Sequence, residues 1–337
     1  MKRMMRIGWI RIDNSKDQYK FGGSIYNERS RIILSKLGRL SIFPVATEVI
    51  KGKSYLQLPS LFKALIGLRG DQDVWVRDFY SAVSKLFDHT TGKSIVLIHH
   101  IDTTTLPRML KIFFLFYEKM FYMALRRSDA IVVMSKYWRD HFLALGFRHV
   151  YTVYNPIDFE KMTITARDVE KFRKKYQLSH RPIIYLGNCR PYKGVVEAYE
   201  ALKDLDVQFV TSGHRSVSLP VQNLVLEHKE QLILQKLSTI AIAMSLFKEG
   251  WSMTVHESMY MKTPVIGTGS GGMGELLRGG KQIQCRDFSQ LKKHVVKLLN
   301  NSGLRKKIGN DGHRYAKQFT RKRFEKDWAK VIQEINR

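Results

Sequence analysis

The segment from Phe247 to Met259 places polar groups at the end of an apolar run, directly before a predicted helix. It contains two carboxylates, Glu249 and Glu257, with seven residues between them. A carboxylate at the end of a strand can accept hydrogen bonds from sugar hydroxyls, whereas the unbonded N–H groups at a helix start suit a phosphate. Groups of the second kind are Gly250 and the backbone near Ser252, Met253 and Thr254.

The same residues also have a purely structural interpretation. Thr254 and Glu257 are spaced as a capping box, in which case Glu249 is a solvated loop residue. The spacing favours neither interpretation, so both stay open here.

A glycine-rich turn follows the apolar run Thr263–Thr268 and precedes a helix that starts near Glu275. Its glycines would let a ligand approach the backbone closely, yet the pattern is neither a Walker loop nor a clean dinucleotide fingerprint. The glycines of this turn are Gly269, Gly271, Gly272 and Gly274.

A second pair of glycines, Gly22 and Gly23, precedes a predicted helix over Ser24–Leu37, which Gly38 ends. Such a helix start could also meet a phosphate, although taken alone two glycines favour an ordinary turn. We expect the inward face of this helix to consist of Ile25, Ile32, Ile33 and Leu37.

His99 and His100 end a predicted strand, so at least one imidazole should emerge at the edge where parallel sheets bind ligands. Together with Asp102 they could ligate a metal, but no further ligand lies at suitable spacing. We therefore expect a polar contact to a substrate, or packing, and no metal site. The Asp-x-Asp pairs Asp71/Asp73 and Asp204/Asp206 follow no predicted buried strand and are interpreted as chance matches.

Strands and helices must position these candidate groups. Along the chain, apolar β-branched runs that predict strands alternate with stretches that predict helices. Such alternation predicts an α/β fold with doubly wound parallel sheets covered on both faces. The pattern restarts after a charged stretch, Lys161–Arg181, so we expect two such domains facing a central cleft. The predicted strands are Arg6–Ile12, Leu40–Val45, Ser94–His100, Ala130–Met134, Val150–Tyr154, Pro182–Gly187, Val207–Gly213, Asn223–Glu227, Thr239–Leu246, Thr263–Thr268 and Lys281–Cys285.

The composition excludes several classes of protein. The chain has 337 residues, 44% of them hydrophobic, a net charge of +27 and two cysteines, which excludes disordered chains and disulfide scaffolds. Arg6 and Arg11 interrupt the N-terminal apolar run, so we expect no signal peptide and a cytoplasmic location. The basic charge attracts nucleic acid, anionic lipid or phosphorylated substrates without choosing among them.

One segment could contact a membrane. Leu106–Arg127 is rich in aromatic and aliphatic residues with cations along it, and together with Leu61–Arg69 it could lie on an anionic membrane surface. The alternative is a long core helix whose cations reach the surface at its ends.

The motifs in this order resemble the retaining nucleotide-sugar glycosyltransferases of the GT-B fold, glycosyltransferase family 4. The resemblance covers most of the chain, and it includes the two-glutamate segment and the glycine-rich turn that follows it. The other motifs that carry it are Gly22-Gly23, His99-His100, Asp129–Ser135, Val153–Asp158 and Tyr185–Gly194.

The resemblance implies roles for individual residues. Glu249 would contact the hydroxyls of the donor sugar, Glu257 the ribose, and Lys193 would neutralise the departing diphosphate. Gly22 and Gly23 would let the first domain close over the phosphates, and His99 or His100 would touch the sugar. The implied donor site also includes Gly187, Asn188, Gly250, Trp251, Ser252, Met253 and Thr254.

Two positions depart from the family pattern. The family usually has an arginine where this chain has Asn188, and Arg190 is the candidate replacement. Ser252 occupies a position where the family often has glycine.

The resemblance also implies the domain organisation and the reaction. Residues 1–155 would be an acceptor-binding domain, 156–320 a nucleotide-sugar-binding domain, and 321–337 a helix that crosses back to the first. The expected activity is retaining, metal-independent hexosyl transfer from a UDP- or GDP-linked sugar to a glycan or lipid-linked acceptor, without a cofactor. The alternatives are an epimerase or hydrolase of the same fold, or a basic nucleic-acid-binding protein; no nucleic-acid motif supports the last.

Overall fold

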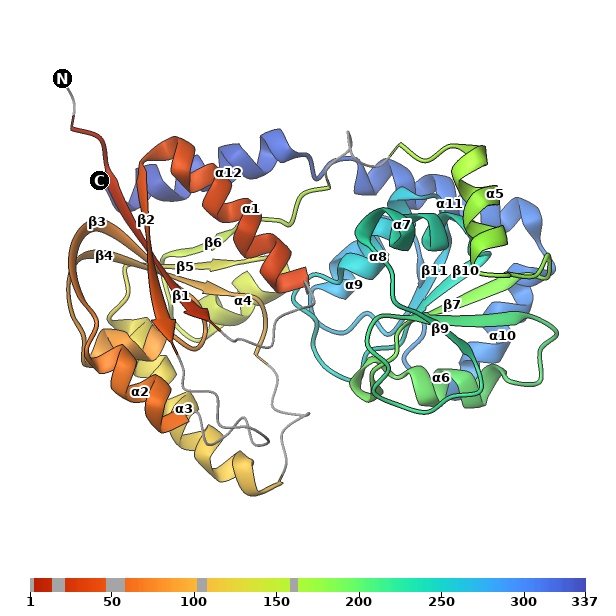
Figure 1. Ribbon diagram of the computed structural model, residues 1–337, viewed down its shortest axis with the longest axis horizontal. Coiled ribbons are helices and arrows are strands. Elements are labelled where there is room, and N and C mark those ends of the chain that lie inside the picture. The colour runs from red at the N-terminus through yellow and green to blue at the C-terminus, as the bar shows by residue number, and fades with distance from the viewer. Residues whose placement is uncertain (1–2, 14–21, 47–57, 102–107, 158–162) are drawn as a thin grey trace. The chain divides into compact units, whose positions relative to one another are not determined.

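The computed structural model describes residues 3–13, 22–46, 58–101, 108–157 and 163–337 (Figure 1). The chain divides into two compact units. Unit 1 combines Met1–Tyr154 with Phe324–Arg337, and unit 2 is Asn155–Arg323. Each unit contains a six-stranded sheet whose paired strands are parallel, and helices cover both faces of each sheet.

The sheet of unit 1 has the strand order β2-β1-β3-β4-β5-β6. β1 and β2 pair in register from Arg6↔Arg39 to Asp13↔Ala46. The elements are β1 (Arg6–Asp13), α1 (Gly22–Leu37), β2 (Arg39–Ala46), α2 (Leu58–Ile66), β3 (Arg69–Arg77), the 3-10 helix η2 (Ala82–Leu86), β4 (His89–Ile98), α3 (Arg108–Arg126), β5 (Ala130–Val133), α4 (Lys136–Ala144) and β6 (Val150–Thr152).

The sheet of unit 2 has the order β12-β11-β10-β7-β8-β9, so its early strand β7 lies beside β10 and β8. The elements are α5 (Ala166–Lys175), β7 (Ile183–Asn188), the 3-10 helix η4 (Pro191–Lys193), α6 (Val195–Leu202), β8 (Gln208–Ser212), β9 (Gln222–Leu224), α7 (His228–Leu237), β10 (Ile240–Ala243), α8 (Met253–Tyr260), β11 (Val265–Gly267), α9 (Met273–Gly279), β12 (Ile283–Gln284), α10 (Phe288–Leu299) and α11 (Ser302–Ala316).

The last helix, α12 (Arg321–Ile335), begins in unit 2 and packs most of its length on unit 1. Phe324 contacts Tyr26 of α1 edge to face, with ring centroids 5.4 Å apart. Lys36 of α1 forms an ion pair with Glu325 at 3.1 Å. These contacts make the C-terminal residues a structural part of unit 1.

The eleven predicted strands are all present, and the parallel α/β architecture is confirmed. One central strand, β3, was missed because Asp71 and Asp73 interrupt its apolar pattern. Both carboxylates form ion pairs with Arg6, and only the second half of the strand is buried. The prediction for the first helix was wrong at Ile32, which is exposed. The buried residues of α1 are Tyr26, Ser30, Ile33 and Leu34.

None of the described helices combines the length and the continuous apolar character needed to cross a membrane.

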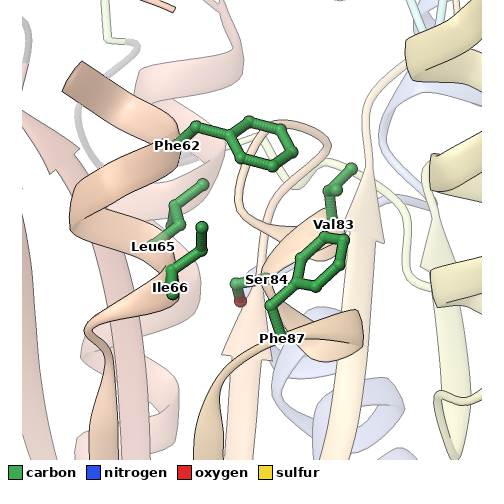
Figure 2. A pocket seen from close by; sticks show the side chains of 6 residues that line it. All are labelled: Phe62, Leu65, Ile66, Val83, Ser84 and Phe87. Carbon is green, nitrogen blue, oxygen red and sulfur yellow. The ribbon is translucent and has the colours of Figure 1, made fainter. Parts of the chain in front are cut away.

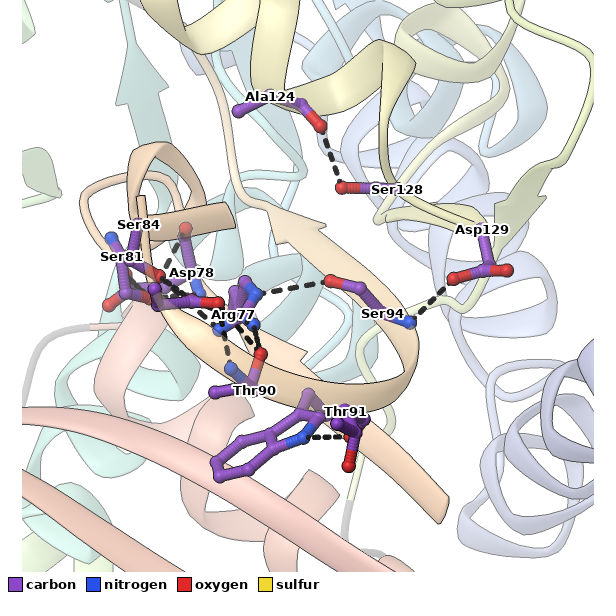
Figure 3. Close-up of polar contacts among 12 residues, drawn as sticks. Arg77, Asp78, Ser81, Ser84, Thr90, Thr91, Ser94, Ala124, Ser128 and Asp129 are labelled. Atoms are coloured by element: carbon purple, nitrogen blue, oxygen red, sulfur yellow. Dashed lines mark hydrogen bonds and ion pairs between the residues drawn. The ribbon is translucent and has the colours of Figure 1, made fainter. Parts of the chain in front are cut away.

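A buried arginine, Arg77, connects β3 to β4 and to the residue before β4 in the sheet of unit 1 (Figure 3). Arg77 ends β3 with no exposed side-chain surface, and its guanidinium lies 3.0 Å from the Asp88 carboxylate, which is 2% exposed. It also donates to Thr90 Oγ1 at 2.7 Å and to Ser94 Oγ at 3.1 Å. Burial lowers the pKa of Arg77 to about 10, and Asp88 opposes that shift, so Arg77 stays charged at neutral pH.

Replacing Arg77 should therefore destabilise unit 1 severely. We expect Arg77→Met to lower the free energy of unfolding by about 3 kcal/mol or more, because it leaves the Asp88 carboxylate buried without its cation. Urea unfolding measures the change. In the double variant Arg77→Met/Asp88→Asn part of the loss should return. Lys93→Met, which breaks the exposed pair with Asp129, should cost less than about 1 kcal/mol. Equal losses in Arg77→Met and Lys93→Met would contradict this account.

Candidate functional site

Glu249 lies in the loop between β10 and α8, and its side chain is buried. Its Oε1 accepts hydrogen bonds from Lys193 Nζ at 2.6 Å and from Ser245 Oγ at 2.5 Å. The solvated-loop interpretation of Glu249 is therefore wrong. An anionic group with two fixed partners near the carboxyl end of β10 is a candidate for recognising hydroxyl groups of a ligand.

The glycine-rich turn after β11 supports the backbone of Glu249. Gly271 pairs with Glu249 in an isolated bridge, and Gly272 N donates to Glu249 O at 2.8 Å. Gly271 has a φ of 66°, and a Cβ there would lie 2.3 Å from Glu249 O. No larger residue fits without moving the loop, so this turn positions Glu249 through its backbone.

Lys193 reaches Glu249 from η4, which follows β7. Gly194 ends η4 in a left-handed conformation, and a Cβ there would lie 2.2 Å from Met244 O. The Lys193 ammonium also lies 4.8 Å from the centre of the Phe247 ring. The side chain is 25% exposed, so the cation can meet a ligand while its position stays fixed.

Arg190 and Asn188 lie near Lys193 in sequence but turn to different partners. Arg190 donates to the Tyr192 hydroxyl at 2.6 Å. The Asn188 Oδ1 accepts from Ser212 Oγ at 3.2 Å, which links the ends of β7 and β8. Gly187 precedes Asn188 with a φ of 83°. Asn188 thus connects the ends of two neighbouring strands, and Arg190 stays a candidate for the role of the family arginine.

The first turn of α8 has no side-chain cap. Ser252, Met253 and Thr254 are half-buried, and the N-cap is Ser252, whose side chain makes no capping bond. The alternative interpretation of Thr254 and Glu257 as a capping box is therefore wrong, because the helix begins at Met253 with Ser252 as its N-cap. Free N–H groups at a helix start bind anions.

Gly250 and Trp251, which lead into this turn, are both buried. The Trp251 indole donates to His256 Nδ1 at 3.0 Å and packs on Phe319. His256 therefore carries its proton on Nε2, which lies 3.3 Å from Ala316 O. The Trp251 side chain, which was predicted as a donor contact, packs in this buried cluster.

Glu257 lies one turn further along α8 and is also buried. Its two oxygens are held by His228 Nε2 at 2.8 Å and by Gln235 Nε2 at 3.3 Å. The nearby Tyr185 hydroxyl lies 2.7 Å from Ser212 Oγ and accepts from Gln231 at 3.0 Å. Burial raises the pKa of Tyr185 to about 12, so it remains a neutral hydroxyl.

Ser252 tests how strictly this loop needs glycine. Its φ of 69° lies in the left-handed region, which costs a non-glycine residue roughly 1 kcal/mol or more. We expect Ser252→Gly to fold with equal stability or a gain of up to about 1 kcal/mol, the gain being reduced by the freer unfolded chain. Ser252→Val should lose at least about 1 kcal/mol. Thermal unfolding measures both, and a large loss in Ser252→Gly would contradict the strain argument.

Unit 1 brings together another part of the predicted set. Gly22 and Gly23 form the start of α1, and a Cβ on Gly23 would lie 3.5 Å from the His99 ring. The ring nitrogens of His99 lie 3.0 Å from Asn27 Oδ1 and 3.0 Å from Met134 Sδ. His100 is exposed, and Asp102 lies outside the described residues. His99 is therefore the histidine associated with the glycine turn.

Burial, and to a smaller extent the charge of His100, lowers the pKa of His99 to about 3. Because the unfolded value is about 6.5, the unfolded chain takes up a proton between these values that the folded chain does not. The His99 contribution is fully present above about pH 6.5 and is lost as the pH falls toward 3. We expect His99→Gln to reduce the fall in Tm between pH 7 and pH 4, and exposed His100→Gln to have a smaller effect, because His100 is the minor cause of the shift. Parallel curves for wild type and His99→Gln would contradict this assignment.

Several residues of the site were not predicted from the sequence. Ser245, His228, Gln235 and Asn27 hold the predicted groups, yet they are distant in sequence or sit inside elements. Ser245 carried a usable signal, since it is a polar residue near the end of a predicted buried strand. Within the described parts of the chain, no group of three or more His, Cys, Asp or Glu side chains could hold a metal ion.

Comparisons with known proteins find relatives of this chain. Residues 167–315 match the family described as Glycosyl transferases group 1. An uncharacterized glycosyltransferase of Methanocaldococcus jannaschii is 24% identical over 257 residues, which cover 72% of this chain and 68% of the relative. The N-acetyl-alpha-D-glucosaminyl L-malate synthase of Bacillus anthracis is 25% identical over 208 residues, covering 55% of this chain and 54% of that protein.

Solved structures match the fold over nearly the whole chain. Sucrose-phosphate synthase from Thermosynechococcus elongatus superposes with a TM-score of 0.76 at 14% identity, covering 98% of this chain and 99% of the other. HepE of Anabaena superposes with a TM-score of 0.75 at 12% identity, covering 98% and 100%.

The two parallel sheets with interleaved helices are the GT-B fold of glycosyltransferases. Within that class, residues 167–315, which hold Lys193, Glu249 and Glu257, are a Glycosyl transferases group 1 domain.

Proposed function

We propose that this protein is a retaining, metal-independent hexosyltransferase, which moves a sugar from a UDP- or GDP-linked donor to a hydroxyl of a glycan or lipid-linked acceptor. The observation that carries the proposal is the buried Glu249 carboxylate, paired with Lys193 near the carboxyl ends of β7 and β10. Parallel α/β domains bind ligands at this edge. The pair offers an acceptor for sugar hydroxyls and a cation for phosphate within one site.

Each group supplies one part of such a reaction. The Lys193 ammonium would neutralise negative charge on the leaving diphosphate, a task that a divalent cation performs in other transferases. The start of α8 would donate N–H groups to the same phosphates. Glu249 would hold the sugar hydroxyls and thereby orient the anomeric carbon. Glu257 would accept from the ribose, in place of the bonds that it now receives from His228 and Gln235.

No group in this arrangement needs to act as a covalent nucleophile. The family that the chain resembles retains anomeric configuration without a covalent sugar intermediate, and its donor phosphate helps to deprotonate the acceptor on the same face. Catalysis would then depend on positioning and electrostatic stabilisation. The assignment of Gly22, Gly23 and one histidine to the ligand belongs to the same proposal, with His99 as the candidate that lies against Gly23.

Ligands of the structural neighbours support a nucleotide-sugar donor. HepE was solved with UDP and glucose and with UDP-glucose. Starch synthase IV of Arabidopsis thaliana was solved with ADP and acarbose. A nucleoside diphosphate is common to these complexes, and the base differs between them.

A thermal-shift panel tests the donor assignment. It would contain UDP, GDP, ADP, CMP and dTDP, with their sugars, each with and without magnesium. A ligand at 100 times its Kd stabilises the native state by about 2.7 kcal/mol, which the assay detects. We expect one nucleotide family to raise the Tm independently of magnesium. Stabilisation by an oligonucleotide, with no response to any nucleotide, would instead support a basic nucleic-acid-binding protein.

The panel repeated with site variants tests the residues. Lys193→Met should abolish stabilisation by the nucleoside diphosphate, and Glu249→Gln should lower the rate of sugar release or transfer by at least about 100-fold, because each removes a charged contact to the reacting groups. Lys248→Met removes an exposed neighbouring charge and is the matched control. Wild-type rates in Glu249→Gln would refute the assignment, and release without an acceptor would favour a hydrolase.

A further inference from the structure

The outer face of α3 exposes large apolar side chains. Leu115, Phe116 and Met123 are 65%, 68% and 44% exposed. Lys119 and Arg126 are exposed between and beyond them, at the spacing of one helical stripe. The opposite face, with Phe121 and Leu125, is buried in the core of unit 1. α3 therefore buries one apolar face and presents a second one to its surroundings.

The apolar surface continues on neighbouring elements. η2 packs against both α2 and α3. Between α2 and η2 lies a small apolar hollow, shown in Figure 2, which is lined by Phe62, Leu65, Ile66, Val83, Ser84 and Phe87. On its rim, Ile66 and Phe87 are 44% and 42% exposed. We call the exposed stripe of α3 together with this rim the α2–α3 face.

The α2–α3 face is gathered in one part of the chain. Among the described residues, thirteen large apolar side chains are exposed, and six of them lie between residues 66 and 123. Five of these six, all but Tyr80, belong to the α2–α3 face, and a group of exposed apolar side chains marks an interaction site more than single scattered ones do.

The charged side chains of α2 and α3 that the structure describes as exposed are all cations. Lys63 of α2 and Lys119, Arg126 and Arg127 at α3 are exposed. The sequences of α2, η2 and α3 contain one carboxylate, Glu118, which is half-buried. The nearby Asp88 carboxylate is buried and neutralised by Arg77. A second copy of the chain would bring like charges together here, whereas anionic lipid headgroups complement the face.

We propose that the α2–α3 face binds the surface of a membrane that contains anionic lipids. Leu115, Phe116 and Met123 insert at the boundary between headgroups and acyl chains, and Lys119 and Arg126 meet the phosphates. The arrangement places α3 parallel to the membrane plane, with its buried face still packed on unit 1. The inference rests on this surface alone and does not depend on the donor site.

Flotation with vesicles tests the proposal on the full chain. The probes are vesicles of phosphatidylcholine alone and of phosphatidylcholine with about 30% phosphatidylglycerol, at low salt. We expect the protein to float with the anionic vesicles and to remain behind with the neutral ones. Leu115→Ser/Phe116→Ser should lower binding at least about tenfold, since both apolar side chains leave the interface. Lys119→Glu/Arg126→Glu should lower it by a similar factor.

Met4→Ser/Ile32→Ser is the matched control, because these apolar side chains are 62% and 45% exposed in the same unit but lie on the N-terminal segment and α1, outside the α2–α3 face. It should float like the wild type, and all variants should keep the wild-type Tm. The proposal is overturned if the wild-type protein does not bind anionic vesicles at low salt. It is equally overturned if the control variant loses as much vesicle binding as Leu115→Ser/Phe116→Ser. It is also overturned if light scattering finds a dimer that Leu115→Ser/Phe116→Ser dissociates while vesicles never bind. Nucleotide-induced stabilisation is measured separately, so either proposal can fail without the other.

Discussion

The ion pair between Glu249 and Lys193 is the interaction on which the candidate site depends. It joins the loop after β10 to the short helix after β7, and it places a carboxylate and a cation at one edge of the sheet of unit 2. A buried carboxylate is stable only when it is paired and hydrogen-bonded, so removing Lys193 or Ser245 would disturb Glu249 itself. The same partial burial strengthens any electrostatic contact that the pair makes with a phosphate or a sugar hydroxyl.

Backbone constraints around this pair explain why small residues surround it. Gly194 and Gly271 adopt left-handed conformations where a Cβ would collide with carbonyl oxygens of neighbouring loops. Ser252 adopts such a conformation without being glycine. Close backbone contacts hold the loops that carry Lys193 and Glu249. These two side chains can therefore have fixed positions although neither lies in a long helix or a strand.

The two units achieve stability by different polar arrangements. Unit 1 holds its central strands with the fully buried pair of Arg77 and Asp88, far from the predicted ligand groups in sequence. Unit 2 places its buried charges, Glu249 and Glu257, at the candidate site. Burying a charge is unfavourable wherever it lies. In unit 2 the buried carboxylates lie at the candidate site, where they can interact with a ligand.

The sequence alone determined the alternation of strands and helices, because apolar periodicity and glycine positions are local properties. It therefore predicted the parallel sheets and singled out the segment with Glu249 and Glu257, whereas the prediction of Lys193 came from the family resemblance. It missed β3, since Asp71 and Asp73 hide a strand whose buried half is only four residues long. Tertiary structure alone decided that Glu249 is buried against Lys193 and Ser245, that Trp251 packs on Phe319, and that His99 rather than His100 lies beneath Gly23. These outcomes depend on contacts between residues far apart in the chain, and no local pattern specifies which partner a charged or aromatic side chain will find.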